Sequence, residues 1–280
     1  MSSLTILARP AATPAAGRTV ALLRAFRSEF TKVCSVRSTY WTLFVLVLAS
    51  MGWCVATCLG TLHQWPGMSP QERAGLDITQ SSILGLAFLG QLIIVVLGAL
   101  MITSEYSTGM MRTSLTVLPR RGTVYGAKAA VLAAVTLVVS LLTSFGTYVL
   151  GRVLLASTHA TAPLSAPGVL RAVIVTALYV EVCGLFAFGI GALVRNTAGT
   201  LTIAFGFLAL LPQLTRALPV PLHNALDRWL PGGDALGVMT ATQGGRPPLL
   251  FSAWGELGVF AGYAAILVLL GALAFRHRDA

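Results

Sequence analysis

The sequence predicts an all-α polytopic membrane protein with six transmembrane helices, and three observations support this prediction. Of the 280 residues, 56% are hydrophobic and only 10% are charged, whereas roughly 25% of the residues in a soluble domain are charged. The mean hydropathy is +0.81. The apolar residues are gathered in six runs, each close to the roughly 20 residues that a helix needs to cross a bilayer.

We expect the membrane-spanning helices at residues 41–62, 83–103, 128–152, 171–194, 198–219 and 253–275. Together they form one six-span domain over residues 41–280. The fifth run contains Pro212, which lacks a backbone N–H and would leave the carbonyl of Leu208 without its helical partner. A kink or an early end is therefore expected in that helix.

The distribution of positive charge predicts the orientation of the chain. An even number of spans places both termini on the same side of the membrane. Of the 19 Lys and Arg residues, 13 lie in the termini or in the loops on that side, and 6 lie on the other. Because cytoplasmic loops are enriched in Lys and Arg, both termini are expected in the cytoplasm and the protein in the cell membrane. The net charge of +10 then requires no nucleic-acid partner.

The segment before the first span divides into two parts. Residues 1–18 contain two prolines and many alanines, and we expect them to be disordered. Residues 19–40 combine basic residues with apolar ones at helical spacing, namely Val20, Leu23, Phe26, Phe30 and Val33. This pattern predicts an amphipathic helix that lies in the membrane interface and also contacts the bilayer lipids. A solvated helix that only orients the chain by its charge is the alternative.

The sequence contains none of the enzyme motifs that we sought. A G-x-x-x-x-G-K-[ST] phosphate loop, an H-E-x-x-H helix and a G-x-S-x-G turn are all missing. The four histidines lie in separate loops or in the C-terminal tail, and Cys54 and Cys58 fit helix packing better than metal binding. The chain is therefore expected to be no enzyme and to hold no cofactor or metal ion of its own.

Two polar residues fall near the middle of predicted spans. Glu181 lies in the fourth span and Gln91 in the second. Ionisable groups at this depth are costly and often functional, so one interpretation is a polar patch on a substrate path. The alternative is a protonated Glu181 that donates a hydrogen bond to a neighbouring helix.

The loop between the second and third spans has an unusual composition. Apolar residues such as Met111 and Leu115 alternate with polar ones, and Pro119 is followed by Arg120 and Arg121. This pattern predicts a short amphipathic helix that ends at Pro119. A plain basic loop would not need so many exposed apolar residues, so a protein partner on this face is expected.

Three stretches of the sequence resemble the permease subunits of ABC-2 type transporters, particularly actinobacterial ones. They are SEFTKVCSVRSTYWTL (28–43), TSEYSTGMMRTSLTVLPRRG (103–122) and LVRNTAGTLTIAFGFLALLP (193–212). The second stretch is the most specific. Met110 departs from the pattern, because similar proteins often have Thr there, and this change should alter local packing more than function.

The resemblance implies an N-terminal interfacial "elbow" helix and a cytoplasmic coupling helix that docks into a separate ATPase subunit. It also implies a second permease subunit, identical or different, and ATP and Mg²⁺ bound by the ATPase. The transporter would be an exporter driven by ATP hydrolysis. The residues implied at the ATPase interface are Glu105, Tyr106, Gly109, Arg112, Leu115, Pro119, Arg120 and Arg121.

Three other functions are compatible with parts of the sequence. A stand-alone secondary transporter could use Glu181 as its coupling carboxylate, although the other spans offer no central carboxylate. An intramembrane hydrolase would need paired acids or a Ser–His arrangement that the sequence does not present. A membrane anchor for a cytoplasmic ATPase would need only the spans and the loop.

Overall fold

The computed structural model describes residues 26–33, 35–108, 121–158, 162–215, 217–219, 221–222, 226 and 253–277. Throughout this part of the chain the only regular secondary structure is helical. Six of its helices are long and apolar enough to cross a membrane: Arg37–Gly67, Ile78–Tyr106, Gly122–Leu154, Val169–Val194, Thr197–Thr215 and Trp254–Phe275. The predicted fold class of six transmembrane helices is thereby confirmed.

The first three spans are long helices, and a short helical connection joins the first to the second. The first is α2 (Arg37–Gln64), which leads through a 3₁₀ turn (Trp65–Gly67) to α3 (Pro70–Gly75). The second consists of α4 (Ile78–Gly85), a π-helical segment (Leu86–Gly90) and α5 (Gln91–Thr108). The third is α7 (Arg121–Leu154), followed by a 3₁₀ turn (Ala156–Thr158).

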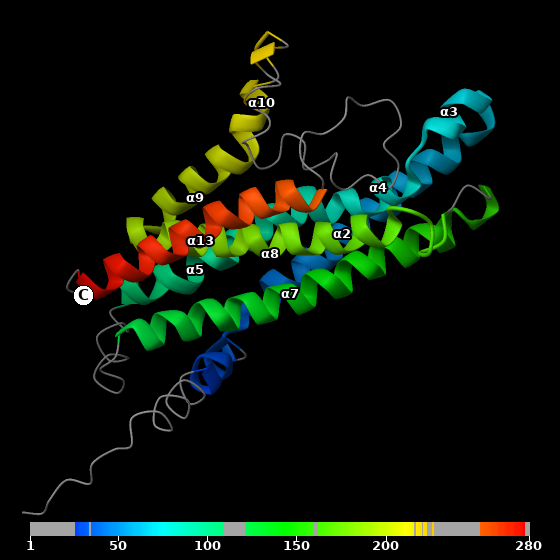
Figure 1. Ribbon diagram of the computed structural model, residues 1–280. Helices are drawn as coiled ribbons and strands as arrows, with labels where there is room; N and C mark the ends of the chain where they lie inside the picture. The colour runs from blue at the N-terminus through cyan, green and yellow to red at the C-terminus, as the bar shows by residue number, and fades with distance from the viewer. Residues whose placement is uncertain are drawn as a thin grey trace, which may run out of the picture.

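The last three spans are α8 (Val169–Val194), a helix in three parts, and α13 (Ala253–His277). The three-part span consists of α9 (Thr197–Phe205), a π-helical segment (Gly206–Leu210) and α10 (Leu211–Thr215). Figure 1 shows this span rising away from the other helices, and only 22% of its apolar window is buried. Most of the apolar surface of this span is therefore exposed and faces away from the other helices.

The expected irregularity at Pro212 takes the form of the π-helical segment. The amide of Leu211 donates to the carbonyl of Gly206, five residues earlier, rather than to the residue four earlier. A π turn of this kind changes the direction of a helix beside a proline, which cannot continue the regular pattern. In the described residues α10 ends at Thr215, before the expected end at residue 219.

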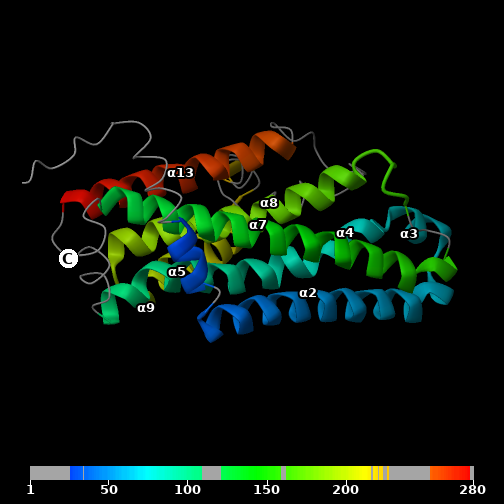
Figure 2. The same ribbon diagram turned by 90° about the horizontal axis from the view of Figure 1, so that it is seen from below.

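Helix α8 is the centre of the bundle. It packs against α5, α7 and α13, as Figures 1 and 2 show, and 78% of its apolar window is buried. Glycines allow these neighbours to approach closely. A Cβ added to Gly98 of α5 would overlap the carbonyl of Gly184 on α8, and one added to Gly189 would overlap Leu267 of α13. Small residues are the usual means of close helix packing in membranes.

The N-terminal segment is helical where it is described. Residues 26–33 form a helix, which we call the N-terminal helix, and Val36 is extended with φ −84° and ψ 112°. Helix α2 begins directly afterwards at Arg37, ahead of the apolar run, because no helix-breaking residue separates Arg37 from Trp41. The N-terminal helix lies across the ends of α5 and α7 (Figure 2). Its interfacial position in a bilayer stays a prediction.

The close contact between α5 and α8 leads to a prediction. Gly98→Ala is expected to lower the free energy of unfolding by about 1–3 kcal/mol, since the new methyl group overlaps the backbone of Gly184. Thermal unfolding in detergent measures the effect. The control is Gly52→Ala in α2, where a Cβ meets nothing within 4 Å and Ala is the better helix former. An equal or higher melting temperature for Gly98→Ala would contradict the packing described here.

Candidate functional site

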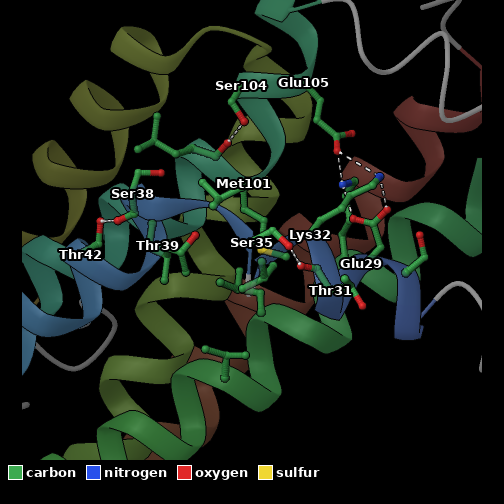
Figure 3. Close-up of a pocket in the computed structure, with 18 residues that line it drawn as sticks. Glu29, Thr31, Lys32, Ser35, Ser38, Thr39, Thr42, Met101, Ser104 and Glu105 are labelled. Atoms are coloured by element: carbon green, nitrogen blue, oxygen red, sulfur yellow. Dashed lines mark hydrogen bonds and ion pairs between the residues drawn. The ribbon is translucent and has the colours of Figure 1, made fainter.

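Four charged side chains meet at one end of the bundle, and we call them the charge cluster. The ammonium Nζ of Lys128 on α7 lies 2.6 Å from Oε2 of Glu29 and 2.5 Å from Oε1 of Glu105 on α5. Lys32 lies one turn after Glu29 on the N-terminal helix, and its Nζ is 2.7 Å from Oε1 of Glu29 and 3.8 Å from Oε1 of Glu105. Figure 3 shows Glu29, Lys32 and Glu105 converging. The cluster therefore ties the N-terminal helix to α5 and α7.

Most of the charge cluster is buried. Glu29, Glu105 and Lys128 are 5%, 7% and 2% exposed, whereas the side chain of Lys32 is 35% exposed. Each buried ion costs several kcal/mol to remove from water unless a partner compensates it. The second carboxylate oxygen of Glu105 is buried and accepts no hydrogen bond from the described residues. Glu105 consequently depends on Lys128 for most of its compensation.

The chain brings the charge cluster to both sides of one loop. Glu105 lies in the last turn of α5, and Lys128 lies about two turns after the start of α7 at Arg121. The residues between the two helices, 109–120, are those in which the sequence predicts the amphipathic coupling segment. Their two flanks are therefore joined directly by the Glu105–Lys128 ion pair, and Lys128 also joins them to Glu29 of the N-terminal helix.

A second set of contacts packs the junction of α8 and α9 on the same end of α5. The guanidinium of Arg195 lies 4.9 Å from the ring centroid of Tyr106, at cation–π distance. The hydroxyls of Thr103 and Thr197 are 2.8 Å apart. Arg195 ends α8 in the left-handed region with φ 57°, and the side chain of Asn196 then caps α9 by accepting from the amide of Gly199.

The structure brings together parts of all three stretches on which the resemblance rests. Stretch 28–43 contributes Glu29 and Lys32, stretch 103–122 contributes Glu105 and Tyr106, and stretch 193–212 contributes Arg195 and Thr197. This convergence makes the end of the bundle at the charge cluster the candidate functional site.

Of the predicted interface residues, the structure places three. Glu105 is in the charge cluster, Tyr106 stacks with Arg195, and Arg121 begins α7. The others lie outside the described residues: Gly109, Arg112, Leu115, Pro119 and Arg120. Sequence reasoning missed the roles of Glu29, Lys128 and Arg195. The sequence offered one signal for this site: Glu29 is an acidic residue in an otherwise basic segment, and such a residue is typical of an ion pair with a basic partner.

The two residues of the predicted substrate path have different surroundings. Gln91 is 7% exposed, and its side-chain oxygen accepts a hydrogen bond of 2.7 Å from the hydroxyl of Tyr179 on α8. Glu181 is half-buried on the same helix. Residues that are two positions apart in an α-helix are separated by about 200° around its axis. Tyr179 and Glu181 therefore point to roughly opposite sides of α8. The hydrogen bond of Gln91 thus goes to Tyr179, and a substrate path through Glu181 stays a prediction.

In the part of the chain that the structure describes, no three His, Cys, Asp or Glu side chains lie close enough to hold a metal ion. The two carboxylates of the charge cluster are each engaged by a lysine ammonium.

The fold and the site define a polytopic membrane protein in which α5 and α7, the helices on either side of residues 109–120, are joined to an N-terminal helix by buried ion pairs. A family model described as ABC-2 family transporter protein matches residues 25–213, which is more than half of the chain. No curated protein matches it. The chain therefore belongs to the ABC-2 transporter family, and the resemblance seen in the three stretches is confirmed.

The burial of Lys128 leads to a second prediction. Lys128→Met is expected to lower the free energy of unfolding by about 3–5 kcal/mol. Buried Glu105 loses its close ammonium partner, and the more exposed Lys32 is then the one remaining cation for both carboxylates of the cluster. The more exposed Lys32→Met is expected to cost about 1 kcal/mol or less. Thermal unfolding in detergent distinguishes the two variants.

A triple variant provides the control for this comparison. Lys128→Met combined with Glu29→Gln and Glu105→Gln removes the carboxylates together with the lysine, and most of the lost stability should return. Equal losses in Lys128→Met and Lys32→Met, or no recovery in the triple variant, would show that the ion pairs are not what stabilises this end of the bundle.

Proposed function

We propose that this chain is the membrane-spanning permease subunit of an ABC-2 exporter driven by a separate ATPase subunit. The observation that supports this function best is the charge cluster, in which Lys128 joins the flanks of the predicted docking loop to the N-terminal helix. Membership of the ABC-2 family supports the same proposal, since its members are membrane components of transporters. ATP and Mg²⁺ would bind to the ATPase, and this chain would carry out no chemical step.

The proposed mechanism is mechanical. Two ATPase subunits close around ATP and each pushes on the loop between Glu105 and Arg121 of one permease. The push reaches α5 and α7 directly and the N-terminal helix through Lys128. Because α5 packs closely on α8 at Gly98 and Gly184, the displacement continues into the centre of the bundle. Such a change requires that ATP binding favour one of two conformations over the other.

The membrane arrangement follows from the distribution of charge. The end of the bundle at the charge cluster would face the cytoplasm, together with both termini, as the excess of Lys and Arg on that side favours. A second permease subunit, identical or different, would complete the translocation path. Glu181 and Gln91 are the polar residues proposed to lie on that path.

A third prediction tests the docking loop. With the wild-type chain purified in mild detergent from its native membrane, an ATPase subunit with a phosphate loop should co-purify. Arg112→Glu is expected to remove most of the bound ATPase, because it reverses a charge in the loop. The amount of ATPase retained per permease is measured by quantitative mass spectrometry.

The matched control reverses a charge at the opposite end of the bundle. Arg152 is exposed near the end of α7 and lies 5.9 Å over the ring of Tyr148, so Arg152→Glu should leave ATPase binding unchanged. If the wild type retains no ATPase even after cross-linking, the permease function is wrong, and secondary transport through Glu181 becomes the function to test. If both variants lose the ATPase equally, the loop is not its docking site.

A further inference from the structure

A pocket of about 700 Å³ has the charge cluster at one end, and the proposed coupling mechanism assigns it no ligand. It is an open pocket lined by the N-terminal helix, the first turns of α2, and residues of α5 and α7 (Figure 3). Its volume falls within the range of roughly 300–1,000 Å³ that is typical of small-molecule sites. We call it the elbow pocket.

One wall of the elbow pocket is lined with hydroxyl groups. The hydroxyls of Thr31, Ser35 and Thr42 donate to backbone carbonyls four residues earlier, at 2.9, 2.6 and 2.8 Å. A hydroxyl has one hydrogen and two lone pairs. Since the hydrogens of these three hydroxyls are already used, their oxygens present hydrogen-bond acceptors to a ligand.

The opposite wall is apolar. Its residues come from α5 and α7: Leu97, Leu100, Met101, Leu132 and Val135. Between Lys128 and Val135, α7 advances by seven residues, or about 10 Å along its axis. The pocket thus changes along its length from a polar end at the charge cluster to an apolar end at Leu97 and Val135, and this gradient matches an amphiphile.

The charge of the polar end restricts the headgroup. The cluster contains two carboxylates and two ammonium groups, and each lysine is paired with a carboxylate. A charged headgroup would face equal numbers of both signs and would gain little net attraction for the cost of leaving water. An uncharged headgroup that donates hydrogen bonds avoids this cost and complements the acceptor wall.

We propose that the elbow pocket binds an amphiphile with an uncharged, hydroxyl-bearing headgroup and an alkyl chain. The hydroxyls of the ligand donate to the acceptor wall, and the chain lies against Leu97, Leu132 and Val135. Binding requires neither ATP nor the ATPase subunit. The proposal therefore stands or falls independently of the transport function.

Equilibrium binding of matched ligands tests the headgroup. The full-length chain is placed in phosphatidylcholine nanodiscs, and empty nanodiscs correct for partition into lipid. The probes are the dodecyl ether of glycerol, the dimethyl ether of that compound, and dodecylamine. The glycerol compound is expected to bind roughly tenfold more tightly than its dimethyl ether, which has lost both hydroxyl donors. Equal affinity of these two, or tighter binding of dodecylamine, would overturn the proposal.

Two pairs of variants test the location. Val135→Trp fills the apolar end and should weaken binding of the glycerol compound at least tenfold. Val138→Trp on the same helix is 55% exposed, lies outside the pocket and should leave binding unchanged. Thr31→Val removes an acceptor beside the charge cluster without changing the shape of the side chain, and should weaken binding roughly two- to tenfold. Thr202→Val is the control for this variant. The hydroxyl of Thr202 also donates to a backbone carbonyl four residues earlier, but it is exposed on α9, outside the pocket.

The variants also keep the proposal falsifiable if one of them fails to fold, because the Val135 and Thr31 pairs act on different parts of the pocket. Unchanged binding in a folded Val135→Trp or Thr31→Val variant would exclude the pocket as the site. Adding a diacyl glycolipid to the nanodiscs distinguishes the source of the ligand. Competition by the glycolipid identifies a bilayer lipid as the occupant, and selective binding of the glycerol ether without such competition identifies a free single-chain amphiphile.

Discussion

Lys128 is held between two buried carboxylates, and the organisation of one end of the molecule depends on this arrangement. Glu29 belongs to the N-terminal helix, Glu105 to α5 and Lys128 to α7, so moving α7 away from either of the other two helices breaks a buried ion pair. Buried ion pairs often contribute little net stability compared with apolar side chains, but breaking one is costly. The cluster therefore favours a single arrangement of three helices. Such rigidity suits a junction that transmits a displacement rather than absorbing it.

The rest of the bundle holds together by close packing. In a bilayer, burying apolar side chains between helices gains little, because the lipid is equally apolar. The glycines of α5 and α8 instead bring backbones into contact, as at Gly98 and Gly184. Helix α8 approaches α5 and α13 in this way and also packs against α7, whereas the span formed by α9 and α10 diverges from the bundle. Rigid contacts thus run from the charge cluster into α8, and a loosely packed span lies at the edge.

The sequence was sufficient to predict six helices, because membrane spans need long apolar runs that few other structures produce. It also located the irregular fifth span through Pro212. It could not predict the charge cluster. A lysine near a helix end serves equally well as an orientation signal, and the partner of Lys128 depends on how the N-terminal helix lies across the bundle, which no local pattern encodes. The pairing of Gln91 with Tyr179 was missed for the same reason, since tyrosine is common in spans and α5 and α8 are far apart in sequence.

The most direct test of the account asks whether the N-terminal helix and α7 move as one unit. Spin labels at Arg27 and Ala130, both exposed, would report the distance between these helices by pulsed electron resonance, with the ATPase subunit bound and with or without ATP. The account predicts one narrow distance distribution that ATP does not change, and a broad one in Lys128→Met. A distance that shifts with ATP in the wild-type chain, or that is unaffected by Lys128→Met, would contradict it.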